Sequence, residues 1–175
     1  MRLFIAINWG DETRTQLLAL RDELSSRSEY GRYSAPENLH LTLVFLGECD
    51  VKQAAAAKAA MDETKFEPFP ITMERVGRFK RSGGDIWWAE VKQSKALADL
   101  QADLADKLIA SGFALEKRKY SPHITIGREV ITSVAPWRVY PFGETVTSIE
   151  LMKSERIAGK LTYTPIYKKE GEQTN

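Results

Sequence analysis

The chain has 175 residues, and its 43% hydrophobic content is enough to bury the core of one domain. Its 25 basic and 24 acidic residues leave a formal net charge of +1, which excludes indiscriminate electrostatic binding to nucleic acid or membranes. The only cysteine, Cys49, excludes an intramolecular disulfide and a thiolate metal cage.

The cellular location follows from segments that the sequence lacks. The apolar run within Met1–Trp9 is too short for the core of a signal peptide. No other run approaches the roughly 20 apolar residues that a membrane helix requires. We therefore expect a cytoplasmic protein.

Apolar periodicity, capping residues and turn residues predict the secondary structure. The expected elements in chain order are a strand at Arg2–Asn8, a helix capped by Asp11 and ending near Ser26, an irregular segment at Ser28–Glu37 that can include a short strand, a strand at Leu39–Leu46, a helix from Val51 to about Thr64 capped by Asp50, strands at Phe69–Phe79 and Ile86–Val91, a helix from Ser94 to about Ser111, a strand from His123 to about Arg128, a loop at Glu129–Gly143, strands near Thr145–Ser154 and Leu161–Tyr167, and a polar frayed tail from Lys168.

Two of these predictions rest on particularly clear patterns. The helix that begins at Ser94 carries leucines at helical spacing on one face: Leu97, Leu100, Leu104 and Leu108. The segment Ser82–Asp85 contains two glycines between strand-like runs and predicts a β-hairpin. A phosphate-binding loop is the weaker interpretation of this segment, because the lysine and following helix of a P-loop are missing.

Both histidines of the chain lie in copies of one tetrapeptide, His40-Leu41-Thr42-Leu43 and His123-Ile124-Thr125-Ile126. In a strand, side chains at i and i+2 share a face, so each histidine points the same way as the threonine after it. A single copy is compatible with a partly buried histidine that has no chemical role. Two copies favour function.

The repetition extends upstream of both histidines. Phe4 precedes His40 by 36 residues and Trp87 precedes His123 by 36 residues, and each half reads strand, helix, connector, histidine strand. This internal echo indicates a duplication. We expect an α+β fold, with one two-lobed domain over residues 1–175, antiparallel or mixed sheets facing a central cleft, and helices on the outside.

Paired histidine-threonine strands suit phosphodiester cleavage. One imidazole can accept a proton while the other donates one, and a hydroxyl beside each can hold a phosphate oxygen. The two histidines lack a recognisable set of carboxylate partners, so we expect no metal and no cofactor.

The segments that carry these motifs are similar to a known family. ENLHLTLVFLGE (Glu37–Glu48) and SPHITIGR (Ser121–Arg128), with RLFIAIN at the start and YTP at Tyr163–Pro165, resemble the two-histidine (2H) phosphoesterases. Within that superfamily the chain resembles the RNA 2′,3′-cyclic phosphodiesterases, also called 2′-5′ RNA ligases.

The resemblance implies a metal-independent hydrolase that opens a terminal 2′,3′-cyclic phosphate of RNA, or of a small cyclic nucleotide, to a 2′-phosphomonoester. It assigns His40 as the proton donor to the leaving 3′ oxygen and His123 as the base that activates water. Thr42 and Thr125 would hold the phosphate. The near-symmetry of the motifs gives no independent reason for this order of acid and base.

The fifth residue after each histidine is a further candidate. By resemblance, Arg128 belongs to the phosphate site, and Phe45 at the equivalent place is a possible stacking residue. Strict alternation would put both on the face opposite the histidines, so Arg128 requires a bend, for which Gly127 is suited. Core packing is the alternative for Phe45.

Weaker candidates for RNA contacts are basic or aromatic. The basic clusters can equally be solvated surface, and the aromatic residues could stack a base. These residues are Lys117, Arg118, Lys119, Arg78, Lys80, Arg81, Tyr30, Tyr33, Trp9 and Trp137. Two other functions remain open: reversible 2′-5′ RNA ligation, and an RNA-end-binding module without turnover.

Overall fold

The computed structural model describes residues 1–116 and 118–173. Its elements in chain order are β1 (Arg2–Asn8), α1 (Asp11–Ser26), β2 (Ser28–Tyr33), the 3₁₀ turn η1 (Pro36–Asn38), β3 (His40–Glu48), α2 (Val51–Glu63), β4 (Phe69–Phe79), β5 (Asp85–Val91), α3 (Lys95–Ala110), β6 (His123–Thr132), β7 (Trp137–Val146), β8 (Ser148–Ile157) and β9 (Lys160–Glu170). The expected α+β class is confirmed.

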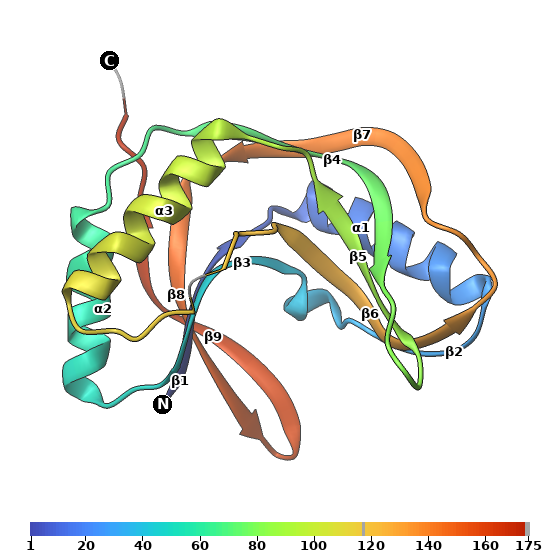
Figure 1. Ribbon diagram of the computed structural model, residues 1–175, viewed down its shortest axis with the longest axis horizontal. Helices are drawn as coiled ribbons and strands as arrows, with labels where there is room; N and C mark the ends of the chain where they lie inside the picture. The colour runs from blue at the N-terminus through green and yellow to red at the C-terminus, as the bar shows by residue number, and fades with distance from the viewer. Residues whose placement is uncertain (117, 174–175) are drawn as a thin grey trace.

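Within the described residues, the strands form two sheets whose neighbouring strands are all antiparallel (Figure 1). The four-stranded sheet has the order β3-β1-β8-β9, and the five-stranded sheet has the order β2-β6-β5-β4-β7. The strand β3 with the first histidine motif is therefore an edge strand. The strand β6 with the second motif is flanked by β2 and β5.

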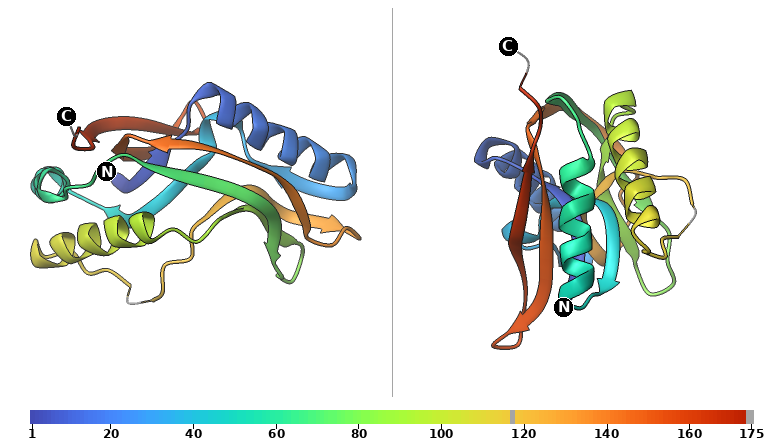
Figure 2. Two further views of the ribbon diagram at one scale, coloured as in Figure 1. Left: turned by 90° about the horizontal axis from the view of Figure 1, so that it is seen from above. Right: turned by 90° about the vertical axis from the view of Figure 1, so that its left-hand side faces the viewer.

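The helix that joins the two strands of each repeat reaches the other sheet. Helix α1 lies between β1 and β3 of the four-stranded sheet and leads directly into β2, and it contacts β2, β6 and β7 of the five-stranded sheet. Helix α3 connects β5 to β6, yet it contacts β3 as well as β4, and it packs beside α2. Figure 2 shows α1 at one end of the molecule and α2 with α3 at the other.

Helices α1 and α3 are held by apolar stripes at helical spacing. Leu17, Leu20 and Leu24 of α1 are buried, and so are the four stripe leucines of α3. Each fully buried leucine contributes about 1.5–3 kcal/mol. Together with buried residues of both sheets and of α2, they form one connected hydrophobic cluster.

Helix α2 begins with a capping box. The Asp50 carboxylate accepts the Gln53 backbone N–H at 2.7 Å, and the Gln53 side-chain carbonyl accepts the Asp50 N–H at 2.9 Å. The predicted cap of α1 is displaced by one residue: Gly10 is the N-cap, and Asp11 is the first helical residue. Asp11 still favours the helix electrostatically at its amino end.

The predicted loop at Glu129–Gly143 is wrong. Strand β6 continues to Thr132, and β7 occupies Trp137–Val146. Pro141 is compatible with β7 because this strand is at the sheet edge, where a missing backbone donor leaves no partner unsatisfied. The predicted frayed tail from Lys168 is also wrong in part, because β9 pairs with β8 as far as Glu170.

The strands β4 and β5 pair as the predicted hairpin, with Phe79 opposite Ile86 beside the turn. The turn end of the β8–β9 hairpin extends at the bottom of Figure 1. Among the described residues, no helix has the length and apolar character to cross a membrane.

Candidate active site

Each histidine is the first residue of its strand, and the two motifs share one burial pattern. His40 and Thr42 are partly exposed while Leu41 between them is buried, and His123 and Thr125 have the same relation across Ile124. The strands β3 and β6 contact each other although they belong to different sheets. The predicted parity of histidine and threonine therefore agrees with the structure.

Both strands depart from alternation after the threonine. In β3, Leu43 and Val44 are both buried, and in β6, Ile126 and Gly127 are both buried. Register shifts occur in the ladder beside each pair. Two successive residues that turn toward the core bring the next residue back to the face of the histidine.

This shift changes the position of the residue five places after each histidine. Phe45 is 52% exposed and lies opposite Phe4 in the β1–β3 ladder, with the Arg2 guanidinium 5.1 Å from its ring centre. Arg128 is exposed beside Arg32 of β2. Among the described residues, the ion pairs include none with Arg128. The bend that Arg128 requires is present, at the shift of the β5–β6 ladder between Thr125 and Gly127.

His40 lies in an aromatic environment. Its ring centre is 4.9 Å from that of Phe4 and 5.2 Å from that of Tyr163, which meets it edge-on. Burial without a counter-charge lowers its pKa from 6.5 to about 4. Its Nδ1 atom is buried without a hydrogen-bond partner among the described residues. In the free protein at neutral pH, His40 is uncharged.

His123 differs from His40 in its hydrogen bonding. Its Nδ1 lies 2.8 Å from the carbonyl oxygen of Ser121. A carbonyl can only accept, so Nδ1 carries the proton and the neutral imidazole has its lone pair on Nε2. Phe79 packs edge-on at 5.3 Å between ring centres, and Trp88 lies at 6.1 Å.

Side-chain hydrogen bonds to backbone carbonyls hold the two motif strands. The Tyr120 hydroxyl donates to the Thr42 carbonyl at 2.8 Å, which ties the segment before His123 to the strand of His40. Burial raises the pKa of this phenol. Ser34 donates to the Thr125 carbonyl at 2.9 Å, and Gln101 of α3 donates to the Leu43 carbonyl at 3.2 Å.

The aromatic residues that contact the histidines are not those singled out from the sequence. Phe4, Tyr163, Phe79 and Trp88 contact them, whereas Trp9 is only 3% exposed. The signal for Trp88 was its place in the strand that pairs with β6, where it lies directly opposite Thr125. That register is a tertiary property which the sequence pattern does not fix.

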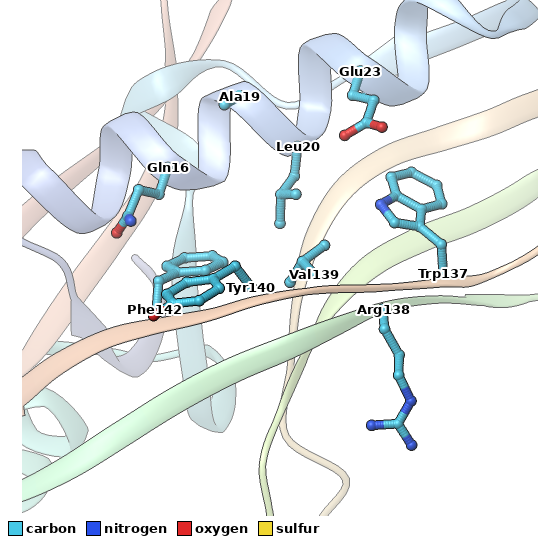
Figure 3. A pocket seen from close by; sticks show the side chains of 9 residues that line it. All are labelled: Gln16, Ala19, Leu20, Glu23, Trp137, Arg138, Val139, Tyr140 and Phe142. Carbon is cyan, nitrogen blue, oxygen red and sulfur yellow. The ribbon is translucent and has the colours of Figure 1, made fainter.

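The remaining aromatic candidates lie elsewhere. Tyr30 is 55% exposed on β2, and Tyr33 lies against Gly127. Trp137 lines a hollow of about 330 Å³ between α1 and β7, together with Leu20 and Phe142 (Figure 3). No residue of either histidine motif lines this hollow.

The basic candidates are distributed rather than gathered at the histidines. Lys117 lies outside the described residues, and Arg118 pairs with Glu116 at 2.9 Å. Arg78 lies over the ring of Trp87, and Lys80 and Arg81 are exposed at the β4–β5 turn. Cys49, also near the first motif in sequence, is buried, and burial raises the pKa of its thiol, so it is a poor nucleophile.

The internal echo is present in the strand-helix-strand order of both halves, but its register differs by one residue from the gap-free alignment. Ala6 lies opposite Thr42, and Trp88, not Ala89, lies opposite Thr125. Trp87, which the alignment equates with Phe4, is fully buried in the core. The two histidines thus have similar surroundings built from non-aligned positions.

Acidic and metal-ligating groups near the motifs are few. Among residues 1–116 and 118–173, no group of three or more His, Cys, Asp or Glu side chains is arranged to hold a metal ion. Asn8 donates to Glu150 at 3.2 Å in the sheet that carries His40, and Glu90 lies directly opposite His123 on β5.

Comparison with known proteins gives a consistent result. The 2′-5′ RNA ligase superfamily matches residues 9–157. A protein of Archaeoglobus fulgidus named RNA 2′,3′-cyclic phosphodiesterase is 34% identical over 175 residues, which cover 96% of this chain and 97% of the relative. The protein of that name from Escherichia coli is 31% identical over 166 residues, which cover 94% and 93% of the two chains.

Solved structures agree with this assignment. The crystal structure of E. coli LigT complexed with 3′-AMP superimposes with a TM-score of 0.87 at 29% identity, with 98% of each chain covered. With both histidine motifs in place on the same fold, the chain belongs to the 2′-5′ RNA ligase superfamily, the two-histidine phosphoesterases that its motifs resemble.

Proposed function

We propose that this protein hydrolyses the 2′,3′-cyclic phosphate at the end of an RNA, or of a small cyclic nucleotide, to a 2′-phosphomonoester. The observation that carries the proposal is the pair of matching strands, each with a histidine and a threonine on one face. The relatives named for this activity, which match over most of the chain, support it. Residues 1–175 act as one two-lobed domain.

In the proposed reaction, His123 accepts a proton from water through Nε2 while the water oxygen bonds to phosphorus. The bond from phosphorus to the 3′ oxygen breaks, and that oxygen takes a proton from His40. The hydrogen bond from His123 to Ser121 favours the tautomer that a base requires.

The order of acid and base follows the family resemblance. For His40 to act as the acid, it has to gain a proton when the substrate binds, because it is uncharged in the free protein at neutral pH. A phosphate anion next to the imidazole raises its pKa and so supplies that condition.

Thr42, Thr125 and Arg128 are the proposed donors to the non-bridging phosphate oxygens. The exposed ring of Phe45, on the histidine side of the bend in β3, is the proposed stacking group. The mechanism is proposed to need no metal, since the two imidazoles provide both proton transfers. The buried free thiol of Cys49 fits a reducing compartment, and the proposed location is the cytoplasm.

The test uses an oligoribonucleotide that ends in a 2′,3′-cyclic phosphate, incubated with the protein and EDTA. We expect a product with a 2′-phosphate, and a loss of turnover of about 10²-fold or more in His40→Ala and His123→Ala. A 3′-phosphate product would contradict the assigned leaving group. Inhibition by EDTA would contradict the metal-free mechanism.

A second candidate is 2′-5′ ligation by the same chemistry in reverse, because the matching family carries that name. Adding a second RNA with a 5′-hydroxyl to the same reaction separates the two activities. Hydrolysis alone gives a 2′-phosphate end, whereas ligation gives a longer RNA with a 2′-5′ linkage. Binding without either product would support the non-catalytic alternative.

A further inference from the structure

A row of charged side chains crosses the five-stranded sheet from His123 to its edge. Glu90 of β5 lies directly opposite His123, Arg75 of β4 lies opposite Glu90, and Arg138 of β7 lies opposite Arg75. Directly paired residues share a face of a sheet. The arginines, here called the arginine row (Arg75 and Arg138), are therefore on the face that carries His123.

The orientation of Arg138 is visible in Figure 3. Arg138 is among the residues that line the hollow beside α1, but its guanidinium group extends to the opposite side of β7 from the side chains of Trp137 and Val139. It is exposed, and the ion pairs within the part of the chain that the structure describes include none with Arg138. The Arg75 side chain is 52% exposed, with its nearest Glu90 oxygen at 4.0 Å. Both guanidinium groups are accessible to a ligand.

Aromatic side chains lie next to the row. Trp88 lies across Gly77 on the neighbouring strand so closely that a Cβ atom on Gly77 would be 2.2 Å from the indole. Trp88 is partly exposed and packs against Phe79, which contacts His123. An aromatic ring beside exposed arginines is typical of surfaces that bind single-stranded nucleic acid.

The length of the row exceeds a single nucleotide. Three steps between neighbouring strands separate His123 from Arg138, which is roughly 14 Å at about 4.8 Å per step. Stacked nucleotides rise about 3.4 Å each along one strand. A substrate whose terminal phosphate is at His123 would meet Arg138 only with nucleotides further from its end.

We propose that the arginine row binds backbone phosphates of the RNA upstream of the cyclic end. The proposal rests on the proposed function, because it takes the terminal phosphate to be at the two histidines. An acidic protein segment would also suit the guanidinium groups, but the stacking surface of Trp88 and the continuity with His123 favour RNA. The protein is therefore selective for oligonucleotides over mononucleotides.

Binding of reaction products tests this without any turnover. Fluorescence anisotropy measures the affinity for a labelled tetranucleotide that ends in adenosine 2′-phosphate, and competition with this probe measures the affinity for 2′-AMP. Both affinities are compared between the wild type, Arg138→Glu and Arg138→Gln. We expect both variants to weaken tetranucleotide binding about tenfold or more, on the scale of a lost charged hydrogen bond, and to weaken 2′-AMP binding by much less. The salt dependence of tetranucleotide binding should fall by about 0.7 in log–log slope for Arg138→Gln.

Lys52→Glu is the matched control, because Lys52 is an exposed cation on α2 outside both the histidine face and the arginine row. It should leave both affinities unchanged, and circular dichroism should show that all variants are folded. The proposal would be overturned if Arg138→Glu weakened the binding of tetranucleotide and 2′-AMP equally. It would also be overturned if Lys52→Glu weakened tetranucleotide binding as much as Arg138→Glu does. If the wild-type protein binds the tetranucleotide through Arg138 but cleaves no cyclic phosphate, only the proposed function fails.

Discussion

Acidification should destabilise this protein through His40. In the native state, burial lowers the pKa of His40 to about 4, while the unfolded chain has the ordinary value of 6.5. The unfolded chain therefore binds a proton more readily between these values. The stabilising contribution is fully present above about pH 6.5 and is lost as the pH falls toward 4.

The size of the effect follows from the two pKa values. Their difference corresponds to a loss of about 3 kcal/mol in the free energy of unfolding when the pH falls through the whole range, at 1.36 kcal/mol per pKa unit. Between pH 7 and pH 5, the loss is about 2 kcal/mol. This is a large part of the roughly 5–15 kcal/mol that stabilises a typical domain.

Urea unfolding followed by tryptophan fluorescence measures this loss, and the chain has four tryptophans. The comparison is between the wild type and His40→Phe at both pH values. Phenylalanine keeps a ring between Phe4 and Tyr163 but cannot titrate, so its loss on acidification should be about 2 kcal/mol smaller than that of the wild type.

Equal losses of stability in the wild type and His40→Phe would refute the reasoning, because carboxylates elsewhere titrate alike in both proteins.

A second measurement connects the same residue to catalysis. Proton NMR of the imidazole should show that inorganic phosphate raises the pKa of His40. A pKa unchanged by saturating phosphate would contradict its role as the acid.

Further expectations concern the phosphate donors, the link between the motifs and the core. Thr42→Val removes a hydroxyl at nearly constant shape and should lower turnover by about 10²-fold, on the scale of a lost oxyanion donor, whereas Thr42→Ser should retain most of it; equal rates would exclude Thr42 as a donor. Tyr120→Phe should lower turnover about tenfold, because the two motif strands would be misplaced, and it should lower the free energy of unfolding by about 1 kcal/mol. The measurements are kcat, KM and urea unfolding. The control Tyr140→Phe, at a residue that is 92% exposed, should change neither turnover nor stability. Leu104→Ala, in the buried stripe of α3, should lower the free energy of unfolding in urea by about 2–5 kcal/mol. The control is Ile109→Ala on the exposed face of the same helix. A loss for Leu104→Ala no greater than that for Ile109→Ala would contradict the packing of the helix.

The parts of the fold that could be predicted from the sequence depend on local patterns. Alternation placed His40 with Thr42, and the leucine stripe of α3 predicted its buried face, because both follow from the geometry of a single element. The strand β7 was missed because Pro136 and Pro141 are typical of loops. Its edge position, which makes Pro141 compatible with a strand, depends on the other strands.

The position of Arg128 in the site also depends on strand pairing. Strict alternation predicted that Arg128 is on the opposite face of its strand from His123, and the sequence offered only Gly127 as a possible bend. The actual cause is a shift in the β5–β6 ladder, matched by one in β1–β3 that moves Phe45 in the same way. The rings beside each histidine were also unpredictable, because strand pairing brings Trp88 and Phe4 there, and an edge hairpin brings Tyr163.

The contacts of α1 join the two repeats into one folding unit. The helix follows β1 of the four-stranded sheet, yet it contacts β2, β6 and β7 of the five-stranded sheet. Its buried leucines belong to the same hydrophobic cluster as buried residues of both sheets. The strands that carry the two histidines are therefore parts of one cooperative unit rather than of two independently stable lobes.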